Sequence, residues 1–209
     1  MVNLYNRIQG RSVERLAALS DGIFAVAMTL LVLDLHLPSA AAVHAEGELL
    51  QALGALGPQW ATYGMSFLTL GIFWAGQQTQ LNHIGEGTRD LTWIHLTFLF
   101  AVTLLPLSTR LLAEFITYRS ALLIYWLNLL GMGAMLYWSW KVATHEGLIK
   151  SDTPDEVRAS ICKRVVIAQS LYAVGAALCV INTWVSICAI VLVQLNYAIA
   201  PRLRHRKRR

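Results

Sequence analysis

Apolar residues in this chain gather into long runs that are separated by short polar segments. A membrane-spanning helix needs about 20 mainly apolar residues, and six stretches come near that length. The predicted spans cover residues 18–37, 59–75, 91–111, 121–141, 165–181 and 183–200. The pattern predicts an all-α integral membrane protein with six transmembrane helices, in which residues 1–209 form a single membrane domain.

Two prolines and one amphipathic segment refine this picture. Pro58 suits the first turn of the second predicted helix, whereas Pro106 lies inside the third and should kink it or loosen its end. Residues 45–56 are amphipathic but too short to span a bilayer, so they are predicted as an interfacial helix or as the start of the second helix.

The composition supports a membrane protein and argues against an enzyme. Hydrophobic residues make up 56% of the chain and charged residues only 14%, against about 25% charged residues in ordinary globular domains. The loops and tails leave no room for a soluble catalytic domain. The sequence has no zinc motif, nucleophile elbow or phosphate loop, and its three cysteines lack metal spacing. We therefore expect no catalytic residues, cofactor or bound metal.

The distribution of basic residues predicts the orientation. The loop of residues 38–58 contains Glu46 and Glu48 but no Lys or Arg. Basic residues instead occupy the N-terminal tail, the loop before the fifth span and the C-terminal tail: Arg7, Arg11, Arg15, Lys150, Arg158, Lys163, Arg164 and most of residues 201–209. The positive-inside rule then places both termini in the cytoplasm of a cell-membrane protein. The C-terminal tail is predicted to contact anionic lipid, and no nucleic-acid partner is expected.

A second interpretation of the first span is a cleavable signal peptide. A basic start, a short apolar core and the small residues Ala40 and Ala42 fit that pattern. Asp21 and Asp34 interrupt or flank the core, which argues against it. Cleavage would leave five spans and place the two tails on opposite sides of the membrane.

The first predicted helix carries polar residues at its start and an apolar stripe beyond them. Placing Asp or Arg toward the bilayer centre costs about 2.5–3.5 kcal/mol, so Asp21 needs a partner or a function. Arg15, Gln77, Asp90 and His95 are candidate partners; a helix-capping role for Ser20 and Asp21 is the alternative. At 100° per residue, one stripe contains Val26, Leu30 and Leu33, flanked by Thr29, whereas Asp21 points away from it. Periodicity alone leaves open whether this stripe packs against protein, faces lipid or lines a pore.

The sequence of this helix resembles the signature of the transmembrane protein 175 family of potassium channels. That family begins its first helix with Arg-x-x-x-Phe-Ser-Asp, and Arg15, Leu19, Ser20 and Asp21 occupy the matching positions here. The run GIFAVAMTLLVLDL continues the match, as do WATYGMSFLTLGIFW in the second helix and DLTWIHLTFLFAVTLLPLSTRLLAEF in the third. The specific resemblance covers about the first half of the chain.

The resemblance implies six-span prokaryotic subunits that form a homotetramer, with four first helices around a potassium path. It implies apolar constrictions at Val26 and Leu33, a hydroxyl layer at Thr29 and a pore-facing Leu30. It also implies a polar network behind the pore, for which the matching or neighbouring residues are Arg15, Ser20, Asp21, Gln77 and His95. The family lacks the Thr-Val-Gly-Tyr-Gly filter of ordinary potassium channels, and so does this sequence.

Four departures from the family pattern bear on the function. Leu19 replaces the motif Phe, and Val26 is smaller than the common Ile. Gln77 stands near the position of a common His, and His95 stands where an Asn is common. The leading prediction is a potassium-preferring cation channel with a hydrophobic gate. The alternatives are a proton-conducting or proton-coupled transporter with Asp21, Asp34 and His95 as its relay, and a non-conducting membrane scaffold.

Overall fold

The computed structural model describes residues 12–40 and 43–206, with side chains described up to Ile199. Arg7, Arg11 and the basic C-terminal tail predicted to contact lipid therefore lie outside the described side chains. The described residues form helices α2 (Val13–Leu33), α3 (Glu46–Ala55), α4 (Gly57–His83), α5 (Arg89–Thr103), α6 (Leu105–Glu114), α7 (Arg119–His145), α8 (Asp155–Ala177), a 3-10 turn (Leu178–Val180) and α9 (Thr183–Arg206). The predicted all-α fold is confirmed.

Within the part of the chain that the structure describes, four helical stretches are long and apolar enough to cross a membrane: Val13–Leu33, Arg89–Glu114, Arg119–His145 and Asp155–Val180. Helix α4 has 27 residues, but its threonines and four glutamines lower its hydropathy. Helix α9 contributes a shorter apolar stretch, Thr183–Ile199. These helices are thus capable of spanning a membrane by their length and composition, and the count of six spans stays a prediction.

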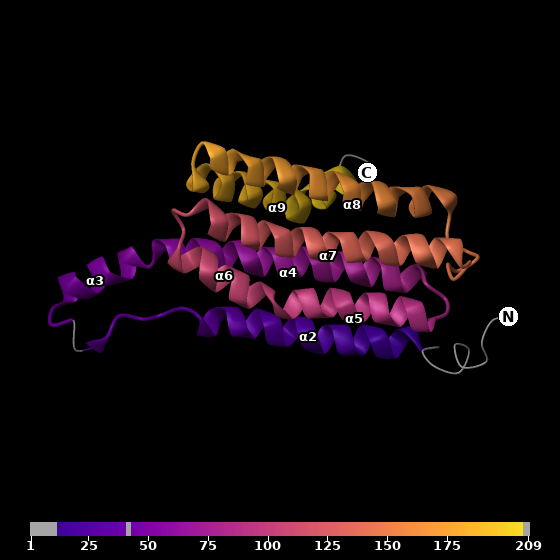
Figure 1. Ribbon diagram of the computed structural model, residues 1–209, viewed down its shortest axis with the longest axis horizontal. Helices are drawn as coiled ribbons and strands as arrows, with labels where there is room; N and C mark the ends of the chain where they lie inside the picture. Colours follow the sequence, from indigo (N-terminus) through magenta and orange to yellow (C-terminus); the bar gives the residue numbers. More distant parts are fainter. Residues whose placement is uncertain (1–11, 41–42, 207–209) are drawn as a thin grey trace.

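The third predicted span is broken near its middle. Helix α5 ends at Thr103, and α6 begins at Leu105 with Pro106 in its first turn. Proline lacks a backbone N–H and its ring crowds the preceding turn, so the helix stops at Leu104 and restarts in a new direction (Figure 1). The interruption expected at Pro106 is confirmed.

Helix α3 extends beyond the bundle (Figure 1) and has no buried residue. Only Leu56 separates α3 from α4, and it keeps right-handed helical dihedral angles. The Trp60 N–H donates to the Leu56 carbonyl at 3.0 Å, which continues the hydrogen-bond pattern across the junction. Of the two structures expected for residues 45–56, the observed one is a helix that leads directly into α4.

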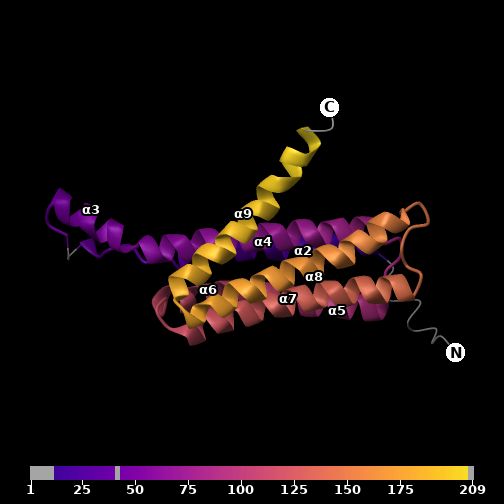
Figure 2. The same ribbon diagram turned by 90° about the horizontal axis from the view of Figure 1, so that it is seen from above.

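The long helices pack side by side, as Figures 1 and 2 show. Helix α2 contacts α4, α5 and α6 at one edge of the bundle, and α7 connects α5 with α8. Helix α9 packs against α8 and α4 and then diverges from the bundle (Figure 2). Helices α2 and α8 begin at one end of the bundle, where α4 and α7 also end. We call this the amino-terminal end of the bundle.

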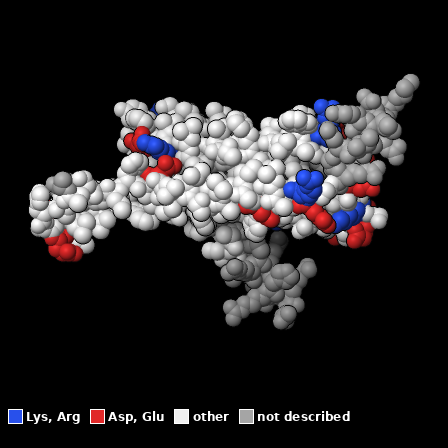
Figure 3. All heavy atoms as spheres, turned by 90° about the horizontal axis from the view of Figure 1, so that it is seen from below, with Lys and Arg blue, Asp and Glu red and all other residues white. Residues whose placement is uncertain are grey.

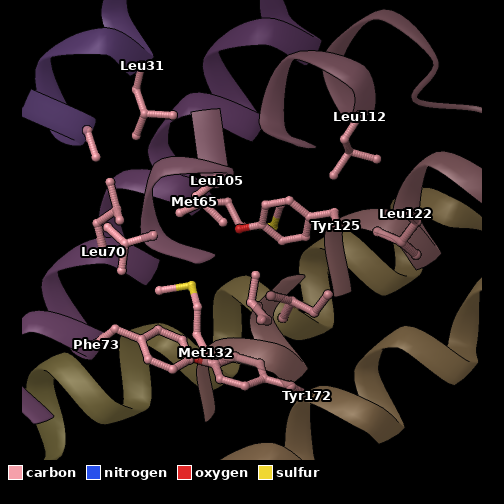
Figure 4. Packing of buried hydrophobic residues seen from close by; sticks show 14 of the residues in the cluster. Leu31, Met65, Leu70, Phe73, Leu105, Leu112, Leu122, Tyr125, Met132 and Tyr172 are labelled. Atoms are coloured by element: carbon pink, nitrogen blue, oxygen red, sulfur yellow. The ribbon is translucent and has the colours of Figure 1, made fainter. Parts of the chain in front are cut away.

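The main apolar core lies between α2, α4, α5, α6 and α7, with further residues from α8 and α9 (Figure 4). Leu70, Leu105, Leu122 and Tyr125 are fully buried there. Fully burying such a side chain contributes about 1.5–3 kcal/mol relative to exposure in water. On the face drawn in Figure 3, charged side chains gather toward the ends of the bundle and on α3, and the surface between them is mostly uncharged.

A short backbone pairing joins two loops at the amino-terminal end. Ile84 and Ile149 form an antiparallel bridge, in which the Gly85 N–H donates to Leu148 at 2.8 Å and the Lys150 N–H donates to His83 at 2.9 Å. The Lys150 ammonium also donates to the Asn82 carbonyl at 2.8 Å. These bonds tie the α4–α5 loop to the α7–α8 loop; we call them the loop bridge.

Candidate ion path and polar network

Ser12 immediately precedes α2, and its hydroxyl accepts from the Arg15 backbone N–H and caps the first turn. Its buried residues recur at helical spacing along one face: Leu16, Ser20, Phe24, Ala27 and Leu31. The polar network and the core lie against this face.

The predicted pore stripe lies on a different, exposed face of α2. Val26, Leu30 and Leu33 are 57%, 44% and 74% exposed in the single chain. Helix α2 is also the most hydrophobic of the four span-capable stretches, with a mean hydropathy of 2.1. A shallow groove along this face is lined by seven α2 residues and by Thr103. The structure therefore leaves an apolar surface on α2 that no other described helix covers.

Thr29 places one hydroxyl on the exposed part of α2. Its Oγ1 donates to the Val26 carbonyl of the same helix at 2.8 Å. Because that bond uses the only hydroxyl proton, the oxygen presents its remaining lone pairs outward. An oxygen in this state can accept a hydrogen bond or contact a cation.

Four buried polar side chains form a chain of hydrogen bonds across the bundle. Ser20 on α2 donates to the Gln77 Oε1 on α4. Gln77 Nε2 lies 3.2 Å from His95 Nδ1 on α5, and His95 Nε2 lies 2.9 Å from the Ser139 hydroxyl on α7. All four are fully buried. We call this set the Ser20–Ser139 network.

The order of donors in this network determines the state of the histidine ring. Because Gln77 accepts through Oε1, its Nε2 must donate, so His95 Nδ1 accepts. The remaining proton then lies on Nε2 and is donated to Ser139. A single neutral tautomer of His95 therefore satisfies both neighbours and joins α4 to α7 through one ring.

Asp21 belongs to a separate contact on the α2–α4 surface. Its Oδ1 accepts from Trp74 Nε1 and from Gln78 Nε2, each at 2.7 Å. Its side chain is exposed in the single chain. None of the expected partners (Arg15, Gln77, Asp90 and His95) contacts it within the described residues. The expectation of one network that includes Asp21 is therefore corrected by the geometry, because Gln77 and Gln78 point to different faces of α4.

Arg15 is likewise outside the Ser20–Ser139 network. It lies on an exposed position one turn into α2, and the ion pairs found among the described residues do not include it. Of the five expected network residues, the structure joins Ser20, Gln77 and His95, and it leaves Arg15 and Asp21 apart from them.

Sequence reasoning missed Ser139, Trp74 and Gln78 as partners. Trp74 and Gln78 are spaced by four residues, so they share one helix face, and this spacing was a usable signal. Ser139 lies in a part of the chain where the sequence offered only hydrophobicity, and no local pattern distinguishes it from a serine that faces lipid.

Replacing Asp21 by Asn should weaken the α2–α4 contact by about 1 kcal/mol. The neutral amide loses the charge assistance of two hydrogen bonds, and exposure limits the effect. The midpoint of thermal unfolding in detergent measures it. Trp74→Phe removes one of the same bonds, so the double variant should lose less than the sum. Trp93→Phe, at a 59% exposed position on α5, is the matched control. Additive losses would show that Asp21 acts elsewhere.

Comparison with known proteins shows what the chain resembles. Residues 15–106 match the family model described as the endosomal/lysosomal potassium channel TMEM175. The crystal structure of a lysosomal potassium-selective channel TMEM175 homologue from Chamaesiphon minutus superposes with a TM-score of 0.79 and 27% identity, over 90% of this chain and 97% of that one. The chain is similar to the TMEM175 family, in sequence over about its first half and in fold over nearly its whole length.

Two other relatives show how the similarity is distributed along the chain. A potassium channel of Streptomyces collinus is 39% identical over 102 residues, which cover 49% of this chain and 48% of that protein. The mouse endosomal/lysosomal proton channel TMEM175 is 35% identical over 109 residues, covering 50% of this chain and 22% of that protein. The chain thus matches about half of the Streptomyces protein and about a fifth of the mouse protein. TMEM175 is a family of channels and not of enzymes.

Proposed function

We propose that this chain is a subunit of a potassium-preferring cation channel in which the exposed stripe of α2 surrounds the ion path. The observation that carries the proposal is the uncovered apolar face at Val26, Leu30 and Leu33, on a chain whose fold matches a potassium-selective TMEM175 homologue over nearly its whole length. Four copies packed around α2 would cover that face, with no cofactor and potassium as the permeating ion.

In this proposal the stripe forms the gate. Rings of Val26, Leu30 and Leu33 would make stacked apolar collars, and apolar constrictions can exclude water and so block ions. Thr29 would supply the hydroxyl layer, because its outward lone pairs are the oxygen ligands that the stripe otherwise lacks. The Ser20–Ser139 network would hold α2 in position from behind. The channel would occupy the cell membrane as a six-span subunit with both termini in the cytoplasm.

The contacts of the three ionisable residues of the alternative relay do not support proton transfer along it. Asp21 bonds to Trp74 and Gln78, and His95 lies in the Ser20–Ser139 network. Asp34 is at the opposite end of α2, where its carboxylate lies 4.0 Å from Arg110. No hydrogen bond among the described residues connects the three. Some relatives are named proton channels, so the experiment must distinguish proton flux from potassium flux.

Ion flux through liposomes containing the purified protein tests the proposal. A potassium gradient should drive an ion flux that, unlike the flux through a transporter, does not saturate as the potassium concentration rises. An equal sodium gradient should drive a smaller flux. A pH-sensitive dye inside the same liposomes detects proton movement. Strict coupling to protons would favour the transporter, and absence of flux under every condition would favour the scaffold.

Subunit counting should give four copies per particle in mild detergent, because the proposed ion path forms only where the α2 stripes of several copies meet. Crosslinking followed by mass measurement, or single-particle imaging, provides the count. A cysteine introduced at Leu33 should crosslink between subunits, whereas one at Trp93, which is exposed on α5 and lies off the α2 stripe, should not. A stable monomer, or a dimer with α2 facing lipid, would remove the basis for the pore.

A further inference from the structure

A second hollow lies far from the α2 stripe, between α4, α7, α8 and α9. It has a volume of about 480 Å³, within the range of about 300–1,000 Å³ for small-molecule sites. Its walls are mainly apolar. Phe73 of α4 and Tyr172 of α8 are among the lining residues, and both lie beside Met132 in Figure 4. Helix α9 diverges from the bundle beyond α8 (Figure 2), and its Tyr197 lines the hollow. We call this hollow the α8 cavity.

The α8 cavity contains polar atoms that the protein leaves without partners. Gln80 is 1% exposed, and its Oε1 is buried without a hydrogen-bond partner among the described residues. Gln169 uses its Nε2 to donate to the Leu129 carbonyl at 3.3 Å, but its Oε1 is buried without a partner. Both residues line the cavity. Buried polar groups are nearly always paired, so the two amides indicate an occupant that offers hydrogen-bonding groups.

A glycine determines how the Gln169 amide lies. A Cβ atom at Gly133 would come within 1.8 Å of the Gln169 Nε2. The absence of a side chain at Gly133 therefore lets this amide lie flat against α7, with its unpartnered oxygen in the cavity wall.

Two cations lie where α8 borders the cavity. Lys163 and Arg164 both line it, and neither forms an ion pair with a carboxylate of the described residues. The guanidinium of Arg164 lies over the Tyr197 ring, 6.0 Å from its centroid. The fifth predicted span begins at residue 165, so the two cations lie at the predicted polar boundary and Gln169 and Tyr172 lie deeper. Cations at such a boundary attract anionic lipid headgroups.

We propose that the α8 cavity binds an anionic phospholipid, with its phosphate at Lys163 and Arg164, a hydroxylated headgroup or glycerol backbone near Gln80, and an acyl chain along the apolar wall. The charge, the unpaired amides and the apolar depth together match this amphiphile. The site is distinct from the ion path, and its occupation does not depend on whether the chain conducts.

Native mass spectrometry of the protein, loaded with phosphatidylglycerol or phosphatidylcholine, tests the site. Phosphatidylglycerol should be retained more strongly. Lys163→Gln and Arg164→Gln should each weaken its retention about fivefold, which corresponds to about 1 kcal/mol for each cation near a membrane surface. Lys141→Gln is the matched control, because Lys141 is a cation on α7 that does not line the cavity. Equal retention of the two lipids would overturn the proposal.

A second pair of variants tests the position of the acyl chain. A Cβ at Gly76 would lie 4.0 Å from Leu136, so Gly76→Leu places its bulk in the cavity, whereas Gly71 has open space around it and lies outside. Gly76→Leu should abolish lipid retention, and Gly71→Leu should preserve it. Retention by a folded Gly76→Leu protein would place the lipid elsewhere.

Two further outcomes would assign the cavity to another occupant. Competition by soluble glycerol phosphate at the lipid's concentration would show a site for the headgroup alone. A disulfide between subunits through Ala168→Cys, in a protein whose native cysteines are replaced, would show that a second copy fills the cavity. Either result would overturn the proposal.

Discussion

Replacing Leu33 with asparagine should raise basal potassium flux by about tenfold or more. Leu33 is the most exposed residue of the proposed gate, and an assembly of four copies would convert a whole apolar ring into amides. Amides hydrogen-bond to water, so the constriction would remain wet. A tenfold rise requires the barrier to fall by only about 1.4 kcal/mol. The flux of purified protein in liposomes, per assembled channel, measures the effect.

Val32→Asn is the matched control for this prediction. Val32 is on the same helix and 46% exposed, but at 100° per residue it lies well off the Val26–Leu33 stripe. It should assemble and keep low basal flux. Equal flux from the two variants and the parent protein would show that the ion path is not on the predicted face of α2.

Replacing His95 with leucine should destabilise the protein by about 2–6 kcal/mol. The change leaves the Gln77 amide and the Ser139 hydroxyl without their partner in a dry interior, and each unsatisfied group costs about 1–3 kcal/mol. We expect a low folded yield and a lower unfolding midpoint. His145→Leu, on an exposed residue at the end of α7, should change neither.

Two milder variants separate loss of the hydrogen bonds from loss of the ring. Ser139→Ala removes one end of the Ser20–Ser139 network and should cost about 1 kcal/mol. His95→Asn can keep only one of the two bonds, because its amide is too short to reach both α4 and α7, so its stability should lie between those of the parent and His95→Leu. A His95→Leu protein as stable as the parent would show that the network contributes packing alone.

The sequence predicts helices well here because a membrane imposes strong rules on hydropathy. The runs around α2, α5, α7 and α8 are apolar over enough residues to be unmistakable, and Pro106 has a local steric effect that needs no tertiary information. Helix α4 is harder to predict, since its buried threonines and glutamines contact other helices and lower the very hydropathy that signals a span.

The candidate site was predictable only in part, for a geometric reason. A helical wheel separates Asp21 from the Val26–Leu33 stripe, but it cannot say which of Gln77 and Gln78 faces which neighbour. These two glutamines are about 100° apart around the helix axis. Gln77 therefore belongs to the Ser20–Ser139 network, and Gln78 contacts Asp21. Ser139 depends on the pairing of α5 with α7, which no local pattern contains.

The loop bridge has a consequence for the order in which the chain folds. It joins atoms of residues 68 positions apart, Asn82 and Lys150, so the α4–α5 loop cannot complete its hydrogen bonds until α7 has been synthesised and inserted. Contacts between distant parts of a chain form late, because closing the intervening loop costs entropy first. The segment from α2 to α6 should therefore insert as a loosely packed group of helices. Its packing should become fixed only after α7 inserts and the loop bridge forms.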